Sequence, residues 1–257
     1  MGSLEWLKEH DFKNLETLKE GDDVTELLNV KKYVHPTEEY IYKMSENGRS
    51  PFPNFVPKTD EERVQNIPSK LSNLLDKNII ITKKFDGTSS TYCYCKEEDK
   101  FLICSRNNVI IDRGDKATSH FFEMEKKYKI EEKLRKLGRN LALQGEICGP
   151  KINANRLKLK ENDLFIFNIY DVDSRKYLLW NEVEIIVKEL GINTVDVVYK
   201  GLMKPEWTNI KNLLDLADNQ TYSTGELCEG IVLKTEDLFG RMSFKVISNK
   251  FLLKYGL

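Results

Sequence analysis

Several features that would assign this chain to a common class of protein are missing from its 257 residues. It has only three histidines, and its five scattered cysteines form no CxxC pair, so we expect no structural zinc site. No apolar run is long enough to span a bilayer and no signal peptide is visible, so we expect no membrane association. The patterns GxGxxG and GxxxxGK[ST] are absent, which excludes the usual phosphate-binding loops.

Charge of one sign is also lacking, because the formal net charge is −1. A protein without a general basic field would need a local basic surface to bind nucleic acid. The odd number of thiols indicates a reducing compartment. We therefore expect an intracellular protein, cytoplasmic or nuclear, or a viral or phage protein that acts inside a host cell.

The order of expected elements indicates an α+β fold. Residues 1–32 are predicted to form an N-terminal helical and linker segment, and residues 33–257 the main domain. Thr59 and Glu62 form a capping box that predicts a short helix ending at Pro68. Strands are expected at 79–82, 90–95, 101–104, 141–146, 164–170, 195–199, 231–234, 242–247 and 251–253, and helices at 4–28, 71–75, 118–137, 182–190 and 206–217. The irregular alternation favours antiparallel sheets over a doubly wound sheet.

The segment KKFDGTSST places polar residues at the end of an apolar strand. Strand alternation puts Lys84 and Asp86 on the same face. Taken alone, such a pair is most often a surface ion pair. Other charged residues also interrupt apolar strand runs, namely Glu146, Glu229, Lys234 and Lys245. Sheet geometry can bring all of these charges into one cleft.

Six short motifs carry a resemblance to a known superfamily. KFDG, SRN, QGE, FIFN, EGIVLK and SFKVIS occur in the order of motifs I, Ia, III, IIIa, IV and V of the covalent nucleotidyltransferases, which include DNA ligases, RNA ligases and mRNA capping enzymes. The segments FPNFVPKTDEERVQN and SFKVISNKFLLK resemble the ATP-dependent RNA ligases called RNA ligase 5. This resemblance implies the nucleotidyltransferase fold, ATP-grasp-like, with antiparallel sheets flanked by helices around a nucleotide cleft.

The N-terminal segment departs from this family. GDDVTELLNVKKY resembles the segment that joins an OB domain to the nucleotidyltransferase domain, but the residues before position 21 are too few for an OB barrel. We therefore expect a nucleotidyltransferase domain without its OB domain.

The resemblance implies that Lys84 attacks the α-phosphorus of ATP and forms lysyl–AMP. A free lysine has a pKa near 10.4 and is protonated at neutral pH, so the pKa of Lys84 must fall before it can attack. Lys234, Lys245 and a divalent metal would lower this pKa and balance charge on the α-phosphate. Asp86 and Glu229 are expected to hold hydrated Mg²⁺ or Mn²⁺ largely through water.

Further nucleotide contacts also follow from the resemblance. Phe167 is expected to stack on the adenine, although Phe165 has the same strand parity and competes for this role. Glu146 would contact the ribose hydroxyls, and Arg106 the ribose or the RNA end. Lys83 precedes the nucleophile, where its backbone would contact the adenine.

The RNA would meet a basic stretch directly after motif III. The candidate phosphate contacts there are Lys151, Arg156, Lys158 and Lys160, and a solvated turn is the competing interpretation. The substrate expected is RNA with 5′-phosphate and 3′-hydroxyl ends at a nick in a duplex, joined by a monomeric enzyme. The alternatives are a DNA ligase or a GTP-using capping enzyme with the same lysyl chemistry, or a non-catalytic nucleic-acid-binding module.

Overall fold

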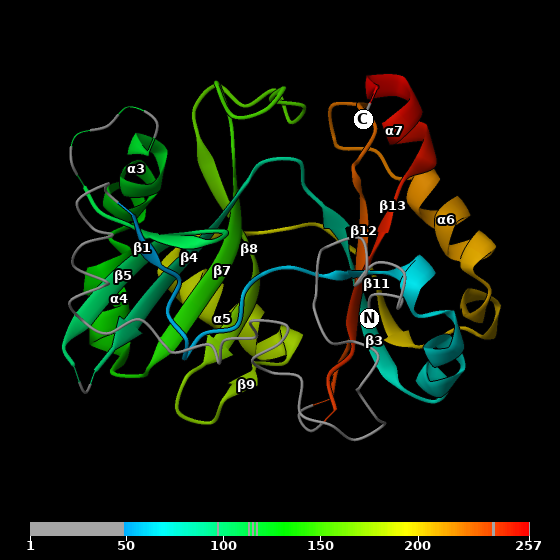
Figure 1. Cartoon of the computed structure of the whole chain (residues 1–257), viewed down its shortest axis with the longest axis horizontal. Coiled ribbons are helices and arrows are strands. Elements are labelled where there is room, and N and C mark those ends of the chain that lie inside the picture. Colours follow the sequence, from blue (N-terminus) through cyan, green and yellow to red (C-terminus); the bar gives the residue numbers. More distant parts are fainter. Residues whose placement is uncertain are drawn as a thin grey trace, which may run out of the picture. The chain divides into compact units, whose positions relative to one another are not determined.

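Two β-sheets form the framework of the described part of the chain (Figure 1). The structure is a computed structural model that describes residues 49–256 except 97, 113, 115, 117, 238 and 239. The strands of the first sheet are β1 (Arg49–Pro51), β4 (Thr88–Cys95), β5 (Lys100–Ser105), β6 (Asn108–Ile110), β7 (Leu141–Cys148), β8 (Asp163–Asp171), β9 (Lys176–Tyr177) and β10 (Asn193–Thr194). Their order is β1-β6-β5-β4-β7-β8-β10, with β9 also paired to β8.

The second sheet contains the strand that ends at the KFDG motif. Its strands are β2 (Glu62–Arg63), β3 (Asn78–Lys84), β11 (Val197–Leu202), β12 (Gly230–Thr235) and β13 (Ser243–Ile247), in the order β11-β3-β12-β13-β2. Most pairs in both sheets are antiparallel, and the parallel exceptions are β10 with β8 and β13 with β2. The predicted α+β class with antiparallel sheets is confirmed.

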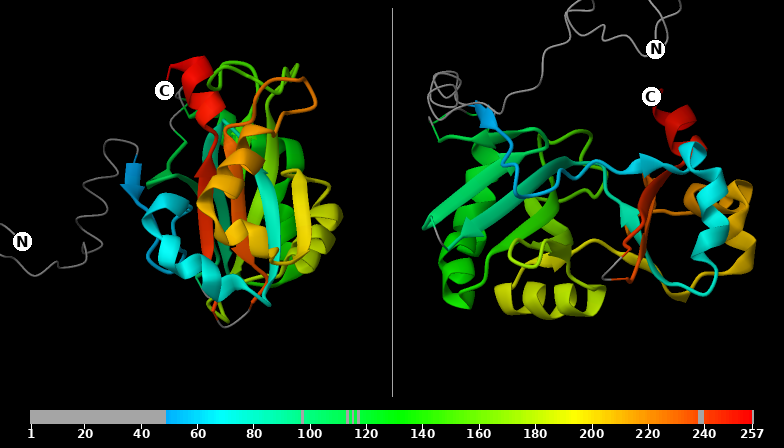
Figure 2. Two further views of the ribbon diagram at one scale, coloured as in Figure 1. Left: turned by 90° about the vertical axis from the view of Figure 1, so that its right-hand side faces the viewer. Right: turned by 60° about the horizontal axis from the view of Figure 1, so that its bottom comes forward.

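Helices cover each sheet on one side. The helices are α3 (Ser119–Tyr128), α4 (Ile130–Leu137), α5 (Trp180–Leu190), α6 (Ile210–Asp218) and α7 (Asn249–Tyr255). Helices α3, α4 and α5 contact the first sheet, whereas α6 lies across β12 and β13 of the second sheet and also contacts α7 (Figure 2). Among the described residues, no helix is long and apolar enough to cross a membrane.

Strand alternation in β3 divides its side chains between two cores. Ile79 and Ile81 are fully buried in the core beneath α6, whereas Ile80 belongs to the core of the first sheet. In the register of β3 with β12, Thr82 pairs with Val232 and Lys84 with Gly230. The even-numbered positions of β3 and β12 therefore face the first sheet, which is where the motif lysines also lie.

Several sequence-based expectations for these elements were wrong in part. The helix expected at 206–217 is the 3₁₀ helix Pro205–Thr208 followed by α6. The strand expected at 251–253 is helix α7, because the Ser248 side chain caps it by accepting from the Phe251 amide at 3.1 Å. No helix starts at the capping box: Thr59 bonds to Ser89 instead, and Glu62 lies in β2. The helix expected at 118–137 is broken into α3 and α4 at Lys129, whose φ is 50°.

The other N-terminal expectations lie outside the described residues. These are the helices at 4–28 and the domain boundary between residues 32 and 33.

Candidate active site

A cleft of about 700 Å³ lies between the two sheets and collects most of the predicted site residues. The ends of β3 and β4 border it, together with Glu146 from β7, Phe167 from β8, and Glu229 and Lys234 at either end of β12. A pocket of this volume is in the range that holds a nucleotide-sized ligand. The arrangement brings residues distant in sequence around one space.

Lys84 lies on the cleft wall at the end of β3. Its Nζ donates to Oε2 of Glu229 at 2.6 Å, and both side chains are partly buried. Burial by itself lowers the pKa of Lys84, but the negative charges of Glu229, Glu146 and Asp86 together outweigh burial and raise this pKa above its ordinary value. The free protein therefore holds Lys84 as an ammonium, which is opposite to the direction that nucleophilic attack requires.

Glu146 supports the turn that follows Lys84. Its Oε1 accepts from the Gly87 amide at 3.2 Å. Burial raises the pKa of Glu146 to about 7, and the charges of Glu229 and Asp86 add to burial while Lys84 opposes it. Gly87 is required here because a side-chain carbon at this position would lie 2.3 Å from the carbonyl oxygen of Ile147.

The Asp86 carboxylate is held by the loop after β7. Its Oδ1 accepts from the side-chain amide of Asn153 at 2.7 Å, and its Oδ2 pairs with Nη1 of Arg156. The Arg156 guanidinium stacks 3.9 Å from the ring centroid of Tyr255 and 4.9 Å from that of Phe251. Arg156 is therefore held against Asp86 at the edge of the site, whereas the sequence suggested a phosphate contact.

The remaining basic residues of this loop are more exposed. Lys158 pairs with Glu226 at 3.4 Å, and Lys151 and Lys160 are exposed. The structure thus separates the predicted RNA contacts into one inward residue, Arg156, and three outward ones.

A divalent cation fits the donor chemistry around Lys84. Three carboxylates, those of Glu229, Glu146 and Asp86, act on this one amine, and hard cations prefer such oxygens. Among the described residues, no three His, Cys, Asp or Glu side chains converge closely enough to ligate an ion directly. The geometry therefore suits an ion that keeps part of its water shell, with Asp86 and Glu229 as the predicted holders.

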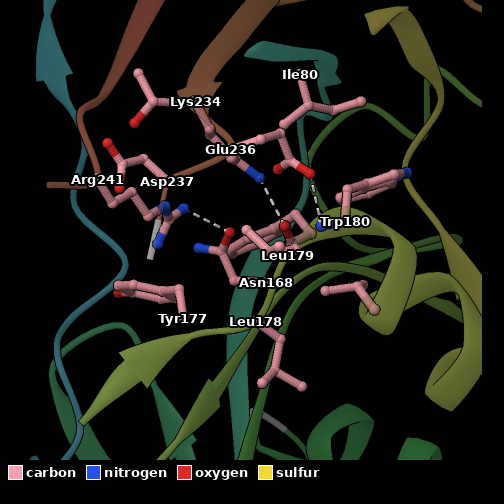
Figure 3. Close-up of a pocket in the computed structure, with 13 residues that line it drawn as sticks. Ile80, Asn168, Tyr177, Leu178, Leu179, Trp180, Lys234, Glu236, Asp237 and Arg241 are labelled. Atoms are coloured by element: carbon pink, nitrogen blue, oxygen red, sulfur yellow. Dashed lines mark hydrogen bonds between the residues drawn. The ribbon is translucent and has the colours of Figure 1, made fainter. Parts of the chain in front are cut away.

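Lys234 has different surroundings from Lys84. Its Nζ donates to the Phe167 carbonyl at 2.6 Å, and only 4% of the residue is exposed. Burial lowers its pKa to about 7, and the charge of Arg241 adds to this effect. Figure 3 shows Lys234 and Arg241 pointing into a small pocket beside Trp180, with about 10 Å³ of space. This volume accommodates about one water molecule.

Lys245 lies on β13 opposite Val232 and lines the cleft. Burial lowers its pKa, and the positive charges of Lys84 and Arg106 lower it further. Lys245 is therefore close enough to Lys84 for the two charges to interact, as the sequence predicts.

The two aromatic candidates on β8 differ in their surroundings. Phe167 lines the cleft, whereas the Phe165 ring packs edge-on against Phe85 with centroids 5.0 Å apart. Phe167 is therefore the better placed to meet a base.

Lys83 and Arg106 line the cleft and are held by acidic partners. Lys83 pairs with Asp196 at 2.8 Å, and the exposed Arg106 donates from Nε to Asp60 at 2.8 Å.

Sequence reasoning missed several residues of the site. Arg63 enters the cleft from β2, which the sequence placed in a helix, and Asn153 and Tyr222 come from loops. Local sequence carried no signal for any of them, because each contact depends on the pairing of distant segments.

The family model described as RNA ligase matches residues 77–247. No curated protein sequence matches the chain. The solved structures that match include several of an RNA ligase from Naegleria gruberi.

The structure of that ligase with PPi is 34% identical, with a TM-score of 0.72, and the match covers 95% of this chain and 70% of that chain. A lysine-to-alanine variant with ATP and Mn is 32% identical, with a TM-score of 0.70 and coverage of 91% and 68%. A glutamate-to-alanine variant with AMP and Mn is 32% identical, with a TM-score of 0.71 and coverage of 95% and 70%. This chain therefore belongs to the RNA ligase family, with the nucleotidyltransferase fold that its motif order predicts.

Proposed function

We propose that this chain is an ATP-dependent RNA ligase in which Lys84 takes AMP covalently, transfers it to an RNA 5′-phosphate and then seals that end to a 3′-hydroxyl. The observation that carries the proposal is the Lys84–Glu229 pair, 2.6 Å long, on the wall of a 700 Å³ cleft. The Naegleria gruberi ligase has been solved with ATP and with PPi, which are the substrate and the leaving group of such a first step, and with AMP, which is the group transferred.

In the first step, the neutral Lys84 amine attacks the α-phosphorus of ATP. A nitrogen–phosphorus bond forms, the bond from the α-phosphorus to the oxygen bridging to the β-phosphate breaks, and pyrophosphate leaves. Glu229 Oε2, 2.6 Å from Nζ, is placed to accept the proton that the amine must lose. Lys234 and Lys245 line the same cleft and would balance the charge on the phosphate.

Asp86 and Glu229 are the residues proposed to hold Mg²⁺ or Mn²⁺. When bound, such an ion would offset the carboxylate charges that keep Lys84 protonated, and would polarise the α-phosphate. The role of the chain is to orient these carboxylates, which the bonds from Asn153 and Arg156 to Asp86 support.

The rest of the nucleotide is assigned to residues of the same cleft. Phe167 would stack on the adenine, and Glu146 would accept from a ribose hydroxyl. Arg106 is proposed to contact the ribose or the RNA end, and the Lys83 backbone the base.

The later steps place RNA against the same cleft. AMP passes from Lys84 to the 5′-phosphate, and the 3′-hydroxyl then attacks that phosphorus and releases AMP. Lys151 and Lys160 are exposed and remain our candidates for phosphate contacts. We propose a nick in a duplex as the substrate and a monomer as the working form. The buried cysteines Cys93, Cys104, Cys148 and Cys228 are free thiols, which supports a reducing, intracellular compartment.

The decisive experiment is incubation of the protein with α-labelled ATP or GTP and magnesium, followed by denaturation. We expect label from ATP, and the mass of one added AMP on the peptide that contains residues 84–87. An adduct with GTP alone would favour a capping enzyme. RNA binding without an adduct would favour a non-catalytic module. Nicked duplexes with RNA or DNA 3′ ends then test the polymer, and sealing of DNA ends alone would overturn the RNA assignment.

A further inference from the structure

The hydroxyl of Tyr222 bridges the backbone of the two functional residues in the KFDG turn. Tyr222 lies in the loop between α6 and β12, and 3% of it is exposed. Its Oη donates to the Lys84 carbonyl at 3.2 Å and accepts from the Asp86 amide at 3.1 Å. One side chain thus fixes the peptide groups on both sides of Phe85.

A buried thiol bonds to the same carbonyl. Cys228 is fully buried, and its Sγ lies 3.2 Å from the Lys84 carbonyl oxygen and 3.3 Å from that of Gly230. The phenol of Tyr222 and the thiol of Cys228 each carry one proton that can be donated. The Lys84 carbonyl therefore accepts bonds from two side chains of one loop.

The loop that carries these donors is itself held at several points. The Tyr222 amide donates to the Glu226 carbonyl at 2.9 Å, and the Cys228 amide to that of Gln220 at 3.1 Å. The ring of Tyr222 also packs edge-on against Phe85, with centroids 5.5 Å apart. These contacts hold the backbone of the KFDG turn and so restrict where the side chains of Lys84 and Asp86 can point.

We propose that Tyr222 is a positioning residue for nucleotide transfer to Lys84, and that Cys228 assists it as a second donor to the same carbonyl. This inference rests on the proposed function of Lys84. Neither side chain lines the cleft, so each acts through the backbone of the KFDG turn. A small displacement of a reacting group can lower the rate about 100-fold. The hydrogen bonds from Tyr222 and Cys228 to the turn can therefore affect the rate by controlling the position of Lys84.

Tyr222→Phe tests the proposal because it keeps the ring against Phe85 and removes only the hydroxyl. Single-turnover formation of lysyl–AMP should slow about 10-fold to 100-fold at saturating ATP, while the ATP concentration for half-maximal rate changes less than about 3-fold. The matched control is Tyr92→Phe, because Tyr92 is fully buried in the first sheet and donates to the Phe121 carbonyl at 2.9 Å. Tyr92→Phe should lose about as much thermal stability as Tyr222→Phe but should form lysyl–AMP at the wild-type rate.

Cys228 provides a graded second test. Cys228→Ser retains a donor and should keep more of the rate than Cys228→Ala, with Cys104→Ala as the control for loss of a buried thiol. In the Tyr222→Phe background, Cys228→Ala should cost more than it does alone, because the carbonyl then loses its last side-chain donor.

The possible outcomes separate the two proposals. A wild-type protein that forms no lysyl–AMP overturns the proposed function and this inference with it. A wild-type protein that forms the adduct while Tyr222→Phe matches its rate overturns the inference alone. Equal slowing in Tyr222→Phe and Tyr92→Phe would also overturn it, since the effect would then be a general loss of stability.

Discussion

Lys84 and Lys234 lie on neighbouring strands of the second sheet but in opposite electrostatic surroundings. Carboxylates hold the pKa of Lys84 above its ordinary value, whereas burial and Arg241 lower that of Lys234 to about 7. Lys84 pairs with Gly230 and Lys234 with Ile80, which separates the lysines by about 13 Å along β3 at roughly 3.3 Å per residue.

The difference shows that burial alone does not decide which lysine loses its proton. Burial lowers the pKa of both amines, and the nearby negative charge reverses the outcome only at Lys84. The free protein therefore has a charged Lys84 amine and a partly neutral Lys234 amine. Binding of ATP with a metal ion should reverse both states, because the ion offsets the carboxylates and the phosphate adds negative charge to the cleft.

The largest expected effect comes from removing the Lys84 amine. Lys84→Ala should abolish lysyl–AMP formation, because no other described lysine pairs with Glu229 in the cleft. The measurement is mass spectrometry of the protein after incubation with ATP and magnesium. Lys211→Ala, at an exposed position on α6, is the control and should label like the wild type. Adduct of undiminished amount in Lys84→Ala would move the nucleophile elsewhere.

Glu229→Gln tests the role of the carboxylate that pairs with Lys84. The glutamine side chain has nearly the shape of glutamate but is neutral. It can neither accept the proton from Lys84 as a base nor supply negative charge to a bound cation, so we expect the adenylylation rate to fall roughly 10²-fold to 10³-fold. Single-turnover kinetics at saturating ATP measure this rate. The matched change Glu206→Gln, at an exposed position on the 3₁₀ helix Pro205–Thr208, should have no effect. A faster reaction in Glu229→Gln would mean that this carboxylate only holds the proton on Lys84.

Arg156→Lys should produce a smaller loss. Lysine keeps the charge but cannot reproduce the planar stacking on Tyr255 and Phe251 while bonding to Asp86. We expect about a 10-fold slower adenylylation and a changed magnesium concentration for half-maximal rate, together with a lower melting temperature in EDTA. Arg139→Lys, in an exposed pair with Asp171, is the control. Identical magnesium curves for wild type and Arg156→Lys would argue against this role in orienting Asp86.

The parts that the sequence predicted are those encoded by local patterns. The apolar runs of β3, β7, β8, β12 and β13 predicted these strands, and alternation predicted that Lys84 and Asp86 share a face; β3 ends at Lys84, and both residues line the cleft. Helix α7 was mistaken for a strand, because the apolar run at Phe251 outweighed the cap at Ser248.

Long-range partners could not be predicted. Arg156 reaches Asp86 across 70 positions, and Tyr222 reaches it across 136. Both come from loops whose positions depend on how the two sheets pack, so no local pattern in KINANRLKLK or around Tyr222 could show which way they point.

The smallest expected effect concerns stability at the other lysine. In the unfolded chain, Lys234 has its ordinary pKa, so between pH 7 and that value the unfolded state binds more protons than the folded state. The contribution of Lys234 to folding therefore becomes more favourable as pH rises from about 7 to 9. Lys234→Met removes this dependence on pH. It should also stabilise the protein at pH 7, because an amine is then no longer buried beside Arg241.

The measurement is the difference in free energy of unfolding between wild type and Lys234→Met at pH 7 and at pH 8. We expect the advantage of the variant to shrink by about 1 kcal/mol over this interval, on a scale of about 1.4 kcal/mol per pKa unit. Lys211→Met should show no such change, because that residue is exposed. A constant difference between the two pH values would mean that Lys234 stays charged in the fold. Its contrast with Lys84 would then lie in the partners of the two amines rather than in their protonation.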